Sequence, residues 1–444
     1  MCSFVHRVLI AATAVAVAGS AGAQLLPSVG LPALPPVSLP SGDVPVVGPT
    51  LQDVLAQPGA QQAVSPTLDT VSGLSERISE APPATLLQLR QLRLQELVRQ
   101  HPRELEFDGT GQPVRRAVLV TVDPDQQSLQ LAAQAGFTII ADDGGAELGL
   151  QIVTLSVPRN LSARQGLKRL RSVAPRLQAD FDHIYEPAGG QLFPIVGTLA
   201  ASQGPRGGPR IGMVDGGVAS HPSMAGASIE QNGFAGQPQP TGHGTAVASL
   251  IVGNDGAFRG AAQGASLFVA DVYGGSRAAG SASSIVRALI WLASKQPQVI
   301  NISLVGPNNR LLQRAVQALR TRGIEVVAAV GNDGPAAPPQ YPASYPDVIS
   351  VTGVDARGRA LPEAGKASHL DFAAPGADMA AALPGQGYAN VRGTSFAAPL
   401  ATARLAITGS AQRLATEARP GKGRVGRGIV CGTCRVDPRA VRAK

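Results

Sequence analysis

The sequence predicts an α/β protein with a doubly wound parallel sheet, preceded by a smaller α+β domain. Three observations support this prediction. The chain has 444 residues, enough for two folded domains and linkers. Hydrophobic residues make up 44% of it and aromatic residues 4%, so the cores must consist largely of Ala, Val, Leu and Ile. In the second half, apolar strands alternate with helices, which is typical of a parallel sheet covered on both faces.

Residues 1–23 have the pattern of a signal peptide. Residues 1–7 are basic, residues 8–22 are apolar, and Ala21-Gly22-Ala23 offers a cleavage site. The apolar run of about 15 residues is short for a membrane span, and no later segment reaches spanning length. We therefore expect export to the periplasm or beyond the cell, with an N-terminal anchor as the alternative. Residues 24–80 are expected to form a Pro-rich linker.

Residues 81–187 are predicted to form the smaller domain. A charged amphipathic helix is expected at 83–100, followed by elements in the order β-α-β-β-α-β, the ferredoxin-like plan. The strands are expected at 117–122, 137–141, 148–157 and 177–185, and the helices at 126–136 and 162–173. Many functions use this plan, so it predicts a topology and no activity. Residues 188–209 are rich in Gly and Pro and are expected to be a linker with a processing site.

Residues 210–412 are predicted to form the larger domain. Its strands are expected at 211–214, 266–270, 299–304, 325–330 and 348–352, and its helices at 245–252, 282–295, 309–322 and 395–407. In open α/β sheets, reactive groups collect at the carboxyl ends of the strands and at the adjoining helix starts.

The last segment, residues 413–444, is basic, and we interpret it as a solvated tail. The net charge of the chain is +8, and residues 418–444 contain eight Lys or Arg but one acid, Asp437. No aromatic residues are interleaved with these cations, so we expect no nucleic-acid partner. Cys431 and Cys434 are expected to form a short-loop disulfide, and a total of three cysteines excludes a four-cysteine zinc site.

Three reactive side chains occupy the site-forming ends of predicted elements. Asp215 ends a strand, while His243 and Ser395 each open a helix. Each alone has an ordinary structural explanation, such as capping, but together they predict a catalytic triad. A serine hydroxyl becomes a nucleophile when a neighbouring base takes its proton. His243 would be that base, and Asp215 would orient the imidazole and stabilise its charged form.

A fourth residue, Asn332, follows a strand and lies next to Gly331. Alone it would be read as a turn residue. Beside a triad, its amide would donate to an oxyanion together with the backbone N–H of Ser395. The order Asp, His, Ser excludes an α/β-hydrolase, in which Ser comes first within G-x-S-x-G. A chymotrypsin-like enzyme would begin with His and be all-β.

At these motifs the chain resembles the subtilisin-like (subtilase) serine peptidases. The motifs are Asp215-Gly216-Gly217, Gly242-His243-Gly244-Thr245, Val330-Gly331-Asn332 and Gly393-Thr394-Ser395-Phe396-Ala397-Ala398-Pro399. The resemblance covers about residues 205–410. It implies a subtilisin-like doubly wound sheet and an endopeptidase that hydrolyses polypeptides through an acyl-enzyme. It also implies that Asp215, His243 and Ser395 are the triad and that Asn332 belongs to the oxyanion hole.

The resemblance further implies a substrate-binding strand at residues 301–306. The residues expected to bind substrate are Ser303, Leu304, Val305, Gly306, Ala329 and Gly331. Gln340 is a further candidate, and the pocket is expected to be neutral and largely apolar. Because subtilases are commonly made with a prodomain of the ferredoxin-like plan, residues 81–187 are expected to assist folding, to inhibit the enzyme and to be removed by self-cleavage.

Two departures from the family pattern bear on activity. Gly216 stands where the family usually has Ser or Thr, and Val305 stands where Gly is usual. The first removes a hydroxyl from the catalytic acid, and the second narrows the substrate groove. They favour an alternative in which the fold is kept as a latent or non-catalytic peptide-binding protein. The family's calcium loops are not recognisable, so no cofactor or metal is expected.

Overall fold

The computed structural model describes residues 83–188, 198–200, 202–203, 207–384 and 387–443. The expected signal peptide and the Pro-rich linker lie outside the described residues, as does most of the linker at 188–209. Within the described ranges no helix is both long and apolar enough to cross a membrane.

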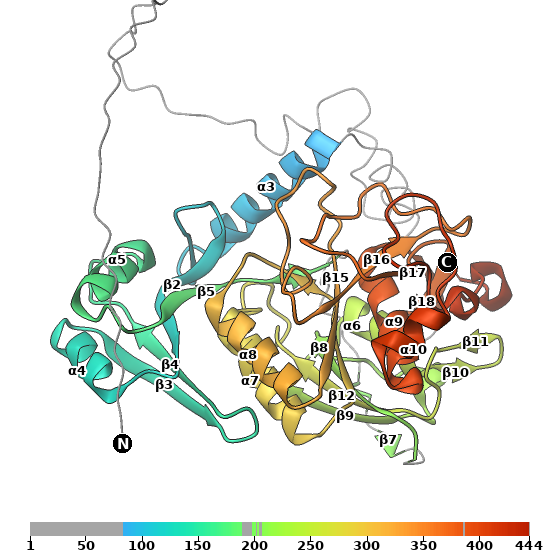
Figure 1. Ribbon diagram of the computed structural model, residues 1–444, viewed down its shortest axis with the longest axis horizontal. Helices are drawn as coiled ribbons and strands as arrows, with labels where there is room; N and C mark the ends of the chain where they lie inside the picture. The colour runs from blue at the N-terminus through green and yellow to red at the C-terminus, as the bar shows by residue number, and fades with distance from the viewer. Residues whose placement is uncertain (1–82, 189–197, 201, 204–206, 385–386, 444) are drawn as a thin grey trace, which may run out of the picture. The chain divides into compact units, whose positions relative to one another are not determined.

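The N-terminal domain (residues 83–188) contains a five-stranded antiparallel sheet and three helices (Figure 1). Its elements are α3 (Pro83–Gln100), β1 (Leu105–Phe107), β2 (Pro113–Val122), α4 (Gln126–Gln134), β3 (Thr138–Gly145), β4 (Leu150–Ser156), α5 (Ala163–Val173) and β5 (Ala179–His183). From β2 to β5 they follow the β-α-β-β-α-β order. Side chains cap α4 and α5: Asp125 accepts from the N–H of Ser128, and Ser162 forms a capping box with Gln165. Strand β1, which pairs with β2, was not predicted.

The C-terminal domain (the described residues from 198 to 443) is built on a sheet in the order β17-β16-β15-β13-β8-β12-β9-β7. Its strands are β7 (Ser202–Gln203), β8 (Arg210–Asp215), β9 (Ser228–Gly233), β12 (Ser266–Asp271), β13 (Val299–Ile302), β15 (Glu325–Ala329), β16 (Ile349–Val354) and β17 (Phe372–Pro375). All neighbours are parallel except β7 and β9. From β8 the chain crosses to β9, returns to β12 and then continues on the other side of β8 through β13, β15, β16 and β17, which confirms the doubly wound α/β prediction.

Helices cover both faces of this sheet. On one face lie α6 (Gly242–Val252) and α9 (Thr394–Thr408), and on the other α7 (Ala282–Ser294) and α8 (Arg310–Thr321) lie side by side (Figure 1). Side chains alternate along β8: Met213 joins the buried cluster with α6 and α9, and Val214 joins the cluster with α7 and α8. Two apolar cores, one on each face, therefore fix the position of every strand end.

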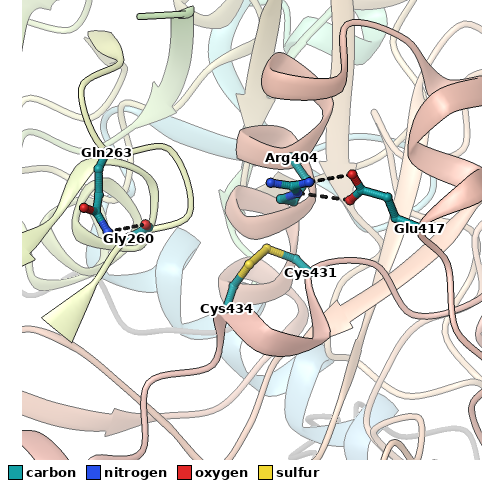
Figure 2. The surroundings of a disulfide bond; sticks show 6 residues. All are labelled: Gly260, Gln263, Arg404, Glu417, Cys431 and Cys434. Atoms are coloured by element: carbon teal, nitrogen blue, oxygen red, sulfur yellow. Dashed lines mark hydrogen bonds and ion pairs between the residues drawn. A yellow bond between two sulfur atoms is a disulfide. The ribbon is translucent and has the colours of Figure 1, made fainter. Parts of the chain in front are cut away.

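The C-terminal segment is a folded part of this domain, so its interpretation as a solvated tail is wrong. After α9 the chain forms α10 (Ala411–Thr416), and its later residues return to the sheet. Val430 and Val436 are buried, and their backbones hydrogen-bond Ala373 and Ala380. The expected disulfide joins Cys431 and Cys434 beside α9 (Figure 2). The tail interpretation rested on the many cations of this segment, whereas the few apolar residues between them pack against the domain.

The smaller elements complete this domain. They are the 3-10 turns Pro222–Met224, Gly432–Cys434 and Pro438–Val441 and the hairpins β10 (Asn254–Asp255) with β11 (Phe258–Arg259) and β18 (Met379–Ala382) with β19 (Tyr388–Val391).

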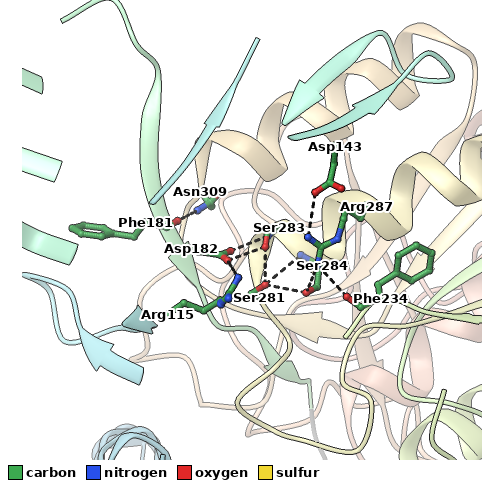
Figure 3. A network of polar contacts seen from close by, with 10 residues as sticks. All are labelled: Arg115, Asp143, Phe181, Asp182, Phe234, Ser281, Ser283, Ser284, Arg287 and Asn309. Atoms are coloured by element: carbon green, nitrogen blue, oxygen red, sulfur yellow. Dashed lines mark hydrogen bonds and ion pairs between the residues drawn. The ribbon is translucent and has the colours of Figure 1, made fainter. Parts of the chain in front are cut away.

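Strand β5 of the N-terminal domain places two carboxylates on helix starts of the C-terminal domain. The fully buried Asp182 accepts hydrogen bonds from the backbone N–H and the hydroxyl of Ser283 in the first turn of α7, at 2.9 and 2.8 Å (Figure 3). Asp180 accepts from the N–H of Arg310, the first residue of α8, at 3.0 Å. Both carboxylates satisfy N–H groups that lack a partner within their helix, and both lie at the positive end of its dipole.

We expect Asp182→Ala to destabilise the full chain by about 1–3 kcal/mol, because it leaves a buried N–H without an acceptor. Asp180→Ala is the matched control: this carboxylate is only half-buried, so the loss should stay nearer 1 kcal/mol. Both are to be compared by denaturant unfolding in a Ser395→Ala background, which prevents self-cleavage. Equal losses for the two variants would contradict the role assigned to Asp182.

Candidate active site

Asp215 and His243 are joined by direct hydrogen bonds. Asp215 is the last residue of β8, and His243 lies in the first turn of α6. The Nδ1 atom of the imidazole is 2.9 Å from each carboxylate oxygen of Asp215, and Oδ1 also accepts the N–H of Gly216 at 2.7 Å. Both side chains are almost fully buried. The arrangement fixes the tautomer that carries a proton on Nδ1 and leaves Nε2 free to accept one.

Ser395 lies in the first turn of α9, on the same face of the sheet as α6. The His243 ring is 5.4 Å from the ring of Phe396, the residue that follows Ser395. The Ser395 hydroxyl and His243 Nε2 are both buried, and neither has a hydrogen-bond partner among the described residues. In enzymes without substrate, the hydrogen bond between a catalytic serine and its histidine is often long, and it shortens in the complex with substrate.

A buried polar network holds the start of α9. The hydroxyl of Ser303 donates to the carbonyl of Ser395 at 3.0 Å and accepts from the amide of Asn301 at 3.0 Å. Thr402, about two turns further along α9, donates its hydroxyl to the side-chain amide oxygen Oδ1 of Asn301 at 3.1 Å. All are fully buried, so each lost bond would leave an unpaired polar group. Sequence reasoning did not single out Thr402, which looks like any polar residue of a helix.

Asn332 is held in one orientation by the residue before the serine. Its Oδ1 accepts the backbone N–H of Thr394 at 3.0 Å, so Nδ2 is left to donate. The Thr394 hydroxyl accepts the N–H of Gly331 at 3.1 Å, and Gly331 has a φ of +90°, which favours glycine. Nδ2 donates to the backbone carbonyl of Ala188, the last described residue of the N-terminal domain.

The end of the N-terminal domain lies as an added strand beside residues 303–305. Strand β6 (Glu186–Pro187) pairs antiparallel with β14 (Leu304–Val305), and the N–H of Ala188 donates to the carbonyl of Ser303 at 2.8 Å. On its other edge, the N–H of Tyr185 donates to the carbonyl of Gly280 at 2.7 Å. Main-chain pairing with the edge of a neighbouring strand is a common way for a protein to bind an extended peptide.

The predicted substrate-binding residues surround this strand. Ala188, Val305 and Ala329 belong to one buried apolar cluster, and a Cβ on Gly331 would lie 3.2 Å from the Val305 side chain. A Cβ on Gly306 would come within 2.5 Å of the Tyr185 ring, so only glycine leaves room for it. Gln340 is also buried and borders the same cavity as Val305 and Gly306.

A group of charges that sequence reasoning missed surrounds Glu186. Its two carboxylate oxygens pair separately, with Arg277 at 2.7 Å and with Arg93 of α3 at 3.0 Å. Burial alone would raise the pKa of Glu186, but the two guanidinium groups outweigh it and lower the pKa below its usual value. Arg90 and Arg93 also bind Asp333, which follows Asn332. No short-range pattern in the sequence links these segments.

Comparison with known proteins decides the family. A model described as "Subtilase family" matches residues 206–419. Subtilisin Savinase of Lederbergia lenta is 35% identical over 201 residues, which are 43% of this chain and 72% of that protein. The chain belongs to the subtilase family. Its class is therefore that of the subtilisin-like serine endopeptidases.

Two further comparisons show how far the similarity extends. An alkaline protease of Alkalihalobacillus alcalophilus is also 35% identical over 201 residues, and this chain spans 51% of its length. The crystal structure of fervidolysin from Fervidobacterium pennivorans, a keratinolytic enzyme related to subtilisin, superposes with a TM-score of 0.59 at 18% identity. That match covers 74% of this chain and 61% of the other, and it supports the subtilase fold.

The structure gives a reason for Gly216, the departure beside the acid of this subtilase. A Cβ at this position would lie 2.4 Å from Oγ1 and 2.6 Å from Cγ2 of Thr241. Thr241 is the N-cap of α6, and its hydroxyl accepts the N–H of Gly244 at 3.0 Å. The Thr241 side chain, which caps the helix of His243, therefore occupies the space that a Cβ at position 216 would need.

We expect Gly216→Ala to destabilise the chain by about 1–3 kcal/mol through this overlap. In a Thr241→Gly background, where cap loss costs only a few tenths, the same substitution should cost less than about 0.5 kcal/mol. Denaturant unfolding of the four Ser395→Ala-based chains of this double-mutant cycle measures both. An equal cost of Gly216→Ala in the two backgrounds would contradict the explanation.

The lowered pKa of Glu186 predicts a pH dependence. A carboxyl with a lower pKa in the folded state adds stability above its unfolded pKa of about 4.3, and this stability is lost as the pH falls through the folded value. The unfolding midpoint of the Ser395→Ala chain should exceed that of its Glu186→Gln derivative at pH 7, and this gap should shrink progressively as the pH falls below about 4. A gap of the same size at every pH from 7 down to acid unfolding would contradict a contribution from the charge of Glu186.

Proposed function

We propose that this chain is an endopeptidase that cleaves its own Ala188–Gly189 bond through Ser395, His243 and Asp215. The observation that carries this proposal is the hydrogen bond from Asn332 Nδ2 to the Ala188 carbonyl. A carbonyl that is held by an oxyanion donor, at the end of a strand paired with residues 303–305, is in the position of the reacting group of a substrate.

The proposed chemistry follows from these atoms. The Ser395 hydroxyl attacks the Ala188 carbonyl carbon while His243 Nε2 takes its proton, and Asp215 stabilises the imidazolium. Asn332 Nδ2 and the N–H of Ser395 stabilise the oxyanion. Collapse of this intermediate breaks the bond to the nitrogen of Gly189, which receives the proton from His243. Water then hydrolyses the ester at Ser395 by the same steps and frees the Ala188 carboxylate.

The N-terminal domain would remain as an inhibitor after this cut. Its strand β6 still covers residues 304–305, and Asp180 and Asp182 still cap α8 and α7. These contacts do not involve the bond that breaks. Release or degradation of this domain would open the cleft to other polypeptides. The signal-peptide pattern of residues 1–23 supports export of the precursor, with no metal or cofactor required for the reaction as derived.

Expression of the full chain and of Ser395→Ala, followed by a fluorophosphonate probe and intact-mass measurement, tests the proposal. The wild type should yield a labelled chain that begins at Gly189, and Ser395→Ala should stay full-length and unlabelled. In subtilisin, loss of the serine costs about 10⁶ in kcat, and loss of an oxyanion donor about 10²–10³, so Asn332→Ala should mature slowly but measurably. Full-length, unlabelled wild type would favour the latent peptide-binding alternative.

A further inference from the structure

The side chain of the third residue before the proposed scissile bond contacts a charged side chain of the C-terminal domain. Counting back from Ala188, the second residue is Pro187 and the third is Glu186. Of these, Glu186 is the one that carries a charge. We propose that Arg277 is a specificity-determining residue that selects polypeptide substrates with Asp or Glu at this third position. The inference rests on the proposed function, because the bound strand then shows how substrates lie.

The geometry at Arg277 is that of direct recognition. Its Nη2 atom donates to Oε1 of Glu186 at 2.7 Å. The Glu186 side chain is only 10% exposed, so a charge there needs a partner, whereas Arg277 is 33% exposed and keeps contact with water. Within the described residues, Glu186 is the one acidic partner of Arg277. The guanidinium is therefore not committed to another part of the C-terminal domain.

The two arginines that bind Glu186 belong to different domains. Arg93 lies on α3 and would leave with the N-terminal domain, whereas Arg277 lies between β12 and α7 and stays. Because each carboxylate oxygen binds a different guanidinium, the bond to Arg277 does not depend on Arg93. The open cleft would keep one cation beside the third position. This cation would favour an acidic residue at the third substrate position, tolerate a neutral residue there and repel Lys or Arg.

Neighbouring positions fix the register that this reading requires. The Tyr185 ring fills the space over Gly306, and its hydroxyl donates to the carbonyl of Pro307 at 2.8 Å. Ala188 is buried in the apolar cluster with Val305. A one-residue slip would move the acid off Arg277 and put a charge against one of these neutral walls. The substrate class is thus an extended segment with a small apolar residue before the cut and an acid two residues earlier.

Quenched fluorescent peptides test this inference. Ile-Tyr-Glu-Pro-Ala-Gly-Gly-Gln, the sequence of residues 184–191, is to be compared with peptides that carry Gln or Lys in place of Glu. For the enzyme matured from the full chain, we expect kcat/KM to be about 2- to 5-fold higher for the Glu peptide than for the Gln peptide, and this ratio should fall as salt is added. In Arg277→Gln the ratio should approach one. Arg277→Glu should prefer the Lys peptide.

Arg93→Gln is the matched control. It removes the other guanidinium from Glu186, but cleavage after Ala188 yields a mature chain identical to the wild type, so the preference for Glu should remain. A labelled mature enzyme that cleaves the Glu and Gln peptides equally would overturn the role of Arg277 alone. A chain that the fluorophosphonate probe never labels would overturn the proposed function and this inference with it.

Discussion

The hydrogen bonds that fix the first turn of α9 are the constraint on which the site depends. The Ser303 hydroxyl holds the carbonyl of Ser395, and Thr394 holds both the backbone of Gly331 and the side chain of Asn332. The nucleophile, the oxyanion donor and the substrate-binding strand thus come from three different elements but are tied to one helix start. Since α9 is buried in the core along nearly its whole length, this start cannot shift without disturbing that core.

The contacts of the N-terminal domain divide into two physical kinds. The strand pairing at Leu304 and Val305 joins backbone groups, which every sequence possesses. The ion pairs of Glu186 and Asp333 and the carboxylate caps on α7 and α8 depend on particular side chains. The first kind holds an extended peptide in register, and the second kind decides which peptide it is. Recognition at the cleft therefore combines a general backbone frame with a local reading of charge.

The sequence was most informative where the relevant contacts are local. Strand-end Asp215 and helix-start His243 and Ser395 could be found because apolar runs mark the strands and glycines mark the turns that follow them. The ion pairs of α3 could not be found, since Arg93 meets Asp333 across 240 positions of the chain. The packing of Val430 was missed for a related reason: a single apolar residue among cations has no period to reveal its burial.

Helix α3 extends the contacts of the N-terminal domain beyond its sheet. Leu86 lies against Gly334, and Arg93 joins Asp333 to Glu186, so the helix spans the loop of the oxyanion donor and the bound strand. With the N-terminal domain in place, Asp333 and Arg277 each face an opposite charge of that domain. Once the domain leaves, both side chains would lose these partners. The precursor would thus conceal a charge pattern that the open enzyme uses to choose its substrates.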